Sequence, residues 1–180
     1  MIKLLALPVL AATLALSACG KPTAGADTLV VAATAVPHAE ILDVVKPLMA
    51  AQGVQLDVRV FNDYVQPNDQ LVQKQVDVNY FQTEPYLDAY NRDRGTTLVT
   101  VAGVHIEPFG AYSRKVKALA DLPVGADVVI PNDPSNNSRA LILLHSAGVI
   151  TLKDPSNALS TQRDITANPK QLNFRELDSA

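Results

Sequence analysis

The sequence predicts an α/β protein built from two lobes. Valine-rich strand patterns alternate with helical patterns, the alternation is interrupted around residues 105–113, and a second alternating set follows. Strand–helix–strand order is typical of parallel βαβ units. We place the first lobe at residues 28–110 and part of a second lobe at residues 111–180.

The first lobe is predicted to open with a buried strand at residues 28–34. A helix follows from Pro37, because apolar residues recur at helical spacing until Gly53, and Pro47 is expected to kink or weaken its last turn. Residues 54–60 alternate apolar and polar, as in a strand with one buried face. The same reasoning predicts a helix at 67–75, an extended segment at 76–81, a helix at 85–94 and a strand at 97–101.

The second lobe follows a crossing segment at residues 104–112, which contains Pro108 and Gly110. Ser138 or Asn137 is expected to cap the helix of this lobe. Since open α/β sheets bind ligands at the carboxyl ends of their strands, two facing lobes predict a binding cleft between them. The predicted elements are a strand at 127–130, a loop at 131–137, a helix at 138–147 and a strand at 173–177.

Residues 1–18 have the pattern of a secretory signal peptide. Lys3 gives it a positive start. The apolar stretch from Leu4 to Leu16 is shorter than the ~20 residues that a membrane-spanning helix needs. We therefore expect this segment to direct export rather than to span the membrane.

The end of the signal peptide, Leu16-Ser17-Ala18-Cys19, resembles a bacterial lipobox. The resemblance implies that Cys19, the only cysteine of the chain, is lipidated and becomes the first residue after cleavage. The alternative is an ordinary signal peptide cut near Ala18. Small and polar residues make 19–27 a predicted flexible tether. The protein is thus expected to be anchored to a bacterial membrane and to face the periplasm or the exterior, with inner or outer membrane left open.

Composition and motifs argue against several function classes. The formal net charge of −3 argues against a nucleic-acid partner. The histidines His38, His105 and His145 lie far apart and lack the spacing of a zinc site. The chain has no G-x-S-x-G, P-loop, G-x-G-x-x-G or H-E-x-x-H motif. We therefore expect no catalytic residue, no metal and no cofactor, and a binding protein rather than an enzyme.

Three segments that follow predicted strands carry polar and aromatic residues suited to recognition. Arg139 offers a two-pronged donor for a carboxylate close to a helix N-terminus. Aromatic residues in the other two segments suit an apolar or thioether side chain. Each feature alone also fits a capped helix or ordinary core packing. The segments are FNDYVQPN at 61–68, NYFQTEPYL at 79–87 and PNDPSNNSR at 131–139.

In order and spacing these segments, with the lipobox, resemble the NlpA/MetQ family of lipoproteins, the substrate-binding proteins of methionine ABC importers. The resemblance covers residues 28–177. It implies a two-lobed periplasmic-binding-protein fold, type II-like, that closes on methionine or a related amino acid. It also implies delivery of that ligand to an ABC permease and its ATPase.

The resemblance also implies roles for individual residues. Tyr64 and Phe81 match aromatic residues around the methionine side chain, and Tyr86 lies beside them. Arg139 matches the arginine that pairs with the ligand carboxylate, with Asn136 in the same loop. Many relatives have histidine where this chain has Thr83, which leaves L-methionine, D-methionine and other small apolar amino acids or dipeptides open.

Members of the family continue past the position of Ala180, so the resemblance implies an incomplete second lobe in this chain. An incomplete lobe exposes strand edges and apolar surface. We therefore expect the 180-residue form to be unstable or unable to bind ligand. The alternatives to a transport role are a surface lipoprotein or antigen, and a non-functional truncated paralogue.

Overall fold

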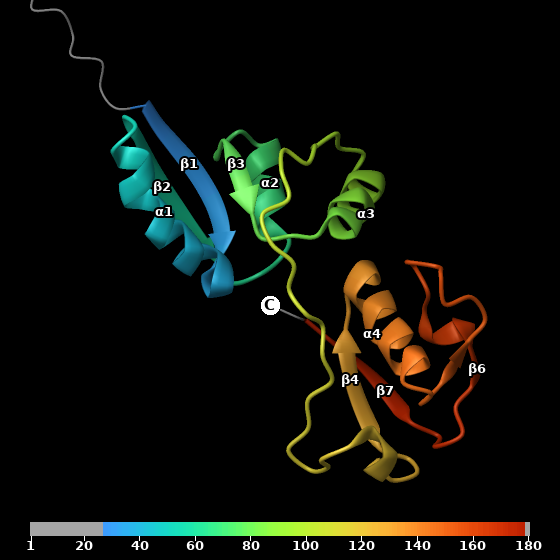
Figure 1. Cartoon of the computed structure of the whole chain (residues 1–180). Helices are drawn as coiled ribbons and strands as arrows, with labels where there is room; N and C mark the ends of the chain where they lie inside the picture. The colour runs from blue at the N-terminus through green and yellow to red at the C-terminus, as the bar shows by residue number, and fades with distance from the viewer. Residues whose placement is uncertain (1–26, 179–180) are drawn as a thin grey trace, which may run out of the picture.

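A computed structural model describes residues 27–178, and its strands form three sheets in that range (Figure 1). In the largest, β1 (Asp27–Thr34) lies between β2 (Val54–Phe61) and β3 (Val78–Tyr80) and is parallel to both. Val31, Ala32 and Ala33 of β1 are buried, so this strand forms the centre of the first unit. The parallel strands joined by helices confirm the predicted α/β class.

Three helices accompany this sheet. A kinked turn, η1 (Ala35–Ala39), in which Val36 has an extended backbone, leads into α1 (Glu40–Ala50), which packs against β2. The other two are α2 (Gln66–Val72) and α3 (Glu84–Arg94). α2 ends before the predicted residue 75, since Lys74 adopts a left-handed backbone with a φ of 58° that a helix cannot continue.

The strand predicted at residues 97–101 is wrong. Between α3 and the 3-10 helix η2 (Leu119–Asp121) the chain forms no helix or strand, and we call residues 95–118 the linking segment. Val99 and Val101 are 77% and 84% exposed. A valine-rich pattern becomes a strand only when a neighbouring strand completes the hydrogen-bond ladder, and no described strand lies beside this one.

The second unit has its own sheet and core. β4 (Asp127–Pro131) pairs in parallel with β7 (Asn173–Leu177), which confirms both predicted strands. Short strands β5 (Thr151–Leu152) and β6 (Ile165–Ala167) form an antiparallel pair, and a 3-10 helix, η3 (Gln162–Asp164), precedes β6. The core joins α4 to these strands through Ile130, Ala140, Leu141, Leu144, Val149, Ile150, Leu152 and Leu172.

Helix α4 (Pro134–Ser146) begins four residues before the predicted start at residue 138. Asp133 is the cap, because its Oδ1 accepts a hydrogen bond from the Asn136 backbone N–H at 2.9 Å. Pro134 stands at the first helical position, where no backbone donor is needed. The predicted caps, Asn137 and Ser138, instead lie buried within the helix.

The carboxyl ends of the two parallel sheets point toward each other. In Figure 1 the arrowheads of β1 and β3 point toward the second unit, and the arrowhead of β4 points toward the first. Helices α3 and α4 contact one another across this boundary. No helix within residues 27–178 has the length and apolar character needed to cross a bilayer. The predicted signal peptide and Cys19 lie outside the described residues.

Leu141 tests the core of the second unit, because its side chain is completely buried. We expect Leu141→Ala to lower the free energy of unfolding by about 2–5 kcal/mol, through lost burial and the cavity it leaves. Urea unfolding followed by circular dichroism measures the change. Leu159, 42% exposed, is the matched control, and Leu159→Ala should change stability by no more than about 0.5 kcal/mol. Equal losses for the two variants would contradict this core.

Candidate functional site

Three predicted aromatic residues form one cluster at the carboxyl edge of the first sheet. Tyr64 follows β2, Phe81 follows β3 and Tyr86 lies in the first turn of α3. Their ring centroids are 5.8–6.2 Å apart in tilted and edge-on arrangements, which aromatic rings prefer. The Tyr86 hydroxyl donates a 2.8 Å hydrogen bond to the Tyr64 carbonyl. The cluster is therefore a positioned apolar wall with polar edges.

A network of side-chain amides holds the two chain segments of this cluster together. Asn68, at the start of α2, is fully buried and exchanges two hydrogen bonds of 2.9 Å with Gln82. Asn79 of β3 donates to Asn68 Oδ1 at 2.8 Å. Because these amides satisfy one another away from water, the network fixes the loop after β2 against the loop after β3.

The environment of the aromatic cluster is partly buried and anionic. Burial, and then the carboxylates of Glu107 and Asp133, raise the pKa of Tyr64. Burial and then Asp133 likewise raise the pKa of Tyr86. Asp133 belongs to the second unit, so the N-terminal turn of α4 lies within electrostatic reach of both tyrosines.

Arg139 is held by an aromatic ring over its guanidinium group and by hydrogen bonds from its two terminal nitrogens. Its Nη1 donates to Asn136 Oδ1 at 2.9 Å, within the first turns of α4. Its guanidinium carbon lies 4.8 Å from the centre of the Phe109 ring, a cation–π geometry. Its Nη2 lies 3.5 Å from the backbone carbonyl of Glu107. An arginine positioned in this way at a helix N-terminus suits a carboxylate ligand.

The structure thus arranges the predicted site residues in two groups. Tyr64, Phe81 and Tyr86 form the aromatic group, and Asn136 with Arg139 forms the cationic group. Thr83 belongs to neither: it caps α3 with an exposed side chain that makes no capping hydrogen bond. A cavity between α3 and α4 is lined by Tyr86 from one side and by Pro134 and Ser135 from the other.

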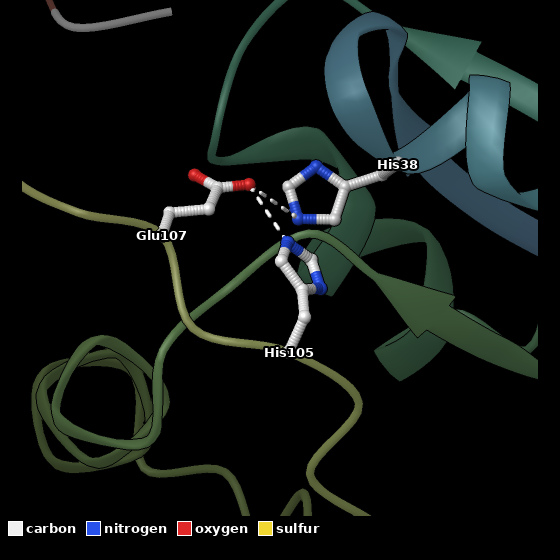
Figure 2. Close-up of side chains that lie close together, drawn as sticks. All are labelled: His38, His105 and Glu107. Carbon is white, nitrogen blue, oxygen red and sulfur yellow. Dashed lines mark hydrogen bonds and ion pairs between the residues drawn. The ribbon is translucent and has the colours of Figure 1, made fainter.

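Reasoning from the sequence missed Phe109 and a cluster of His38, His105 and Glu107 (Figure 2). His38 lies just after β1, while His105 and Glu107 lie in the linking segment. Burial lowers the pKa of His38, partly offset by the nearby Glu107 carboxylate. The i, i+2 spacing of His105 and Glu107 could have indicated part of this cluster, because alternate residues of an extended segment share one face.

Residues 29–180 match the family described as NlpA lipoprotein. The chain belongs to this family. The resemblance carried by the three recognition segments is therefore confirmed, and the lipobox, which lies outside the matched residues, stays a prediction.

Individual relatives cover most of the chain. The methionine-binding lipoprotein MetQ of Bacillus subtilis is 41% identical over 90% of this chain and 61% of its own length. The D-methionine-binding lipoprotein MetQ of Salmonella typhi is 37% identical over 97% of this chain and 65% of its own length. A nutrient binding protein from Burkholderia cenocepacia, solved bound to methionine, superposes with a TM-score of 0.81 at 43% identity, covering 84% of this chain and 64% of that one. The chain spans less than two thirds of the length of these relatives.

The cap of α4 is directly testable, because Asp133 determines where the helix carrying Asn136 and Arg139 begins. We expect Asp133→Ala to lower the free energy of unfolding by about 0.5–2 kcal/mol, since the Asn136 N–H loses its acceptor. Asp133→Asn keeps an acceptor oxygen and should retain most of the stability. Chemical denaturation of both variants measures this. An unchanged free energy of unfolding in Asp133→Ala would contradict the assignment of Asp133 as the cap.

Proposed function

We propose that this NlpA-family lipoprotein binds methionine, or a closely related amino acid, outside the cytoplasm. The observation that carries the proposal is Arg139, held between Asn136 and Phe109 at the start of α4. The names of its relatives add support, since two are called methionine-binding or D-methionine-binding lipoproteins and a third was solved with methionine bound.

The chemistry of the two residue groups matches the two ends of methionine. A carboxylate paired with Arg139 gains about 1.5–3 kcal/mol for each charge-assisted hydrogen bond. Contacts between the thioether sulfur and the rings of Tyr64, Phe81 and Tyr86 add about 0.3–1.5 kcal/mol each. We infer that the lobes, residues 28–110 and 111–180, close on the ligand from its two sides.

The proposed ligand includes both stereoisomers of methionine. Thr83, where many relatives have histidine, offers a hydroxyl that can donate and accept but no ring. Because Thr83 is exposed beside the aromatic group, it contacts a ligand only after the lobes close over it. The comparison of L- and D-methionine is therefore part of the binding experiment.

The proposed biological role is delivery of the bound amino acid to an ABC permease and its ATPase, with no enzymatic step. A lipid anchor at Cys19 and a flexible tether at 19–27 would keep the binding lobes close to the membrane that holds the permease. A surface lipoprotein without a transport role is the competing outcome. Failure of the native protein to bind any amino acid would favour that outcome.

The carboxylate contact is tested with the lipoprotein purified from its native cells, by calorimetric titration with L- and D-methionine. We expect Arg139→Ala to weaken binding by about a hundredfold or more, since two charged hydrogen bonds are lost. Arg139→Lys keeps the charge but loses the two-pronged geometry. Its affinity for methionine should therefore lie between that of the unchanged protein and that of Arg139→Ala.

The control for that titration is Arg175→Ala. Arg175 is exposed on β7 and pairs with Asp127 at 3.2 Å, so its loss should leave the affinity unchanged. Unchanged affinity in Arg139→Ala would refute the assigned contact.

The lipid anchor is tested by the intact mass of the protein extracted from its native membrane. We expect the chain to start at Cys19 and to carry the added mass of two or three acyl chains, since one chain anchors only marginally. Cys19→Ser should abolish the added mass, whereas Ser17→Ala keeps a small residue in the lipobox and should preserve it. A start near Cys19 without added lipid would show an ordinary signal peptide.

A further inference from the structure

The cluster of His38, His105 and Glu107 joins the end of β1 to the linking segment. His105 Nε2 lies 3.0 Å and His38 Nε2 lies 3.5 Å from the same carboxylate oxygen, Glu107 Oε1. Figure 2 shows both imidazole rings turned toward this carboxylate. Within the part of the chain that the structure describes, this is the one group of three side chains close enough to hold a metal ion.

We propose that His38, His105 and Glu107 bind a divalent transition-metal ion such as Zn²⁺. Two imidazole nitrogens and one carboxylate oxygen form a donor set suited to such ions, and they leave further positions for water. Ca²⁺ and Mg²⁺ prefer oxygen ligands throughout and fit this set poorly. The site lies outside the residues proposed to bind methionine.

The distances within the cluster are close to those required around zinc. Ligands about 2.0–2.2 Å from a tetrahedral ion lie about 3.3–3.6 Å from one another. The contacts to Glu107 Oε1 measure 3.0 and 3.5 Å, and the three ligand atoms lie within 4.8 Å of one another. Ligand atoms up to 4.8 Å apart must therefore approach one another by movements that total about 1.2–1.5 Å. The side chains of His105 and Glu107, 28% and 49% exposed, have room for them.

Each imidazole is oriented by a hydroxyl group on its other nitrogen. Thr34 Oγ1 lies 2.7 Å from His38 Nδ1, and the Tyr80 hydroxyl lies 2.6 Å from His105 Nδ1. With an ion bound and the proton on Nδ1, each ring would donate to its hydroxyl oxygen and direct the lone pair of Nε2 toward the ion. Without an ion, His105 Nε2–H donates to Glu107 Oε1 and Nδ1 accepts from the Tyr80 hydroxyl. Such partners behind the ligands fix the tautomer and the ring orientation at metal sites.

Hydrogen bonding alone accounts for only part of this arrangement. His105 Nε2 is within hydrogen-bond distance of Glu107, but the 3.5 Å from His38 Nε2 exceeds the usual 2.7–3.2 Å of an N–H···O bond. His38 is buried and its Nδ1 is already bonded to Thr34. An ion between the three side chains would give His38 Nε2 a partner at full strength.

The proposal is tested by titrating the full chain with ZnCl₂ in a calorimeter, after removal of metal with a chelator. A Cys19→Ser background removes the one thiol as a competing ligand. We expect one ion per chain and an unfolding temperature that rises with Zn²⁺ concentration. Co²⁺ in place of Zn²⁺ should give a visible spectrum of nitrogen and oxygen ligands.

Substitutions test whether these three side chains bind the Zn²⁺ ion. We expect His105→Gln and Glu107→Gln each to weaken Zn²⁺ binding at least tenfold, and Tyr80→Phe, which removes the positioning hydroxyl, by about 10–100-fold. The controls are Glu84→Gln, an exposed carboxylate on α3, and His145→Gln in α4. Circular dichroism identifies any variant that fails to fold. Absence of saturable Zn²⁺ binding, or full affinity in folded His105→Gln and Glu107→Gln, would overturn the proposal.

Discussion

The parallel pairing of β1 with both β2 and β3 is the constraint on which the rest of the first unit depends. In a parallel sheet all strands end at one edge, so the segments that follow them gather there. Tyr64 follows β2, Phe81 follows β3, and His38 follows β1. The aromatic cluster and the histidine cluster therefore lie at the same edge for the same topological reason. Buried alanines at 32 and 33 let the neighbouring segments pack closely over β1.

The second unit contributes to the candidate binding site through the first turns of one helix. Because Asp133 caps α4 and Pro134 opens it, Asn136 and Arg139 stand three residues apart on successive turns, where side chains meet. Had the helix begun at Ser138, Asn136 would lie in a loop and could not hold the guanidinium from the helix. The position of the cap thus determines whether the Arg139 side chain is held in one place or moves freely at the surface.

Strong periodic patterns predicted the strands at β1, β2, β4 and β7 and most of the helices, because burial of one face imposes those patterns directly. The valines at 99 and 101 led to the wrong prediction of a strand, because strand formation depends on a neighbouring strand that the pattern does not reveal. β5 and β6, of two and three residues, are too short to carry a pattern. Five of the six residues that the motifs indicated lie in two compact groups, and their role in binding stays a prediction. Phe109 and the histidine cluster depend on contacts distant in sequence, which no local pattern reveals.

Glu107 is the residue at which the two proposed sites meet. Its carboxylate faces His38 and His105, while its backbone carbonyl lies 3.5 Å from Arg139 Nη2. The two roles use different atoms, so replacing Glu107 by glutamine removes a charged metal ligand and keeps the carbonyl beside Arg139. An ion in the cluster would also tie the linking segment to the end of β1, and with it the adjacent Phe109 ring that lies against Arg139. Since the linking segment forms no strand of its own, such a tie would restrict Phe109 and the Glu107 carbonyl, and through these two contacts the position of Arg139.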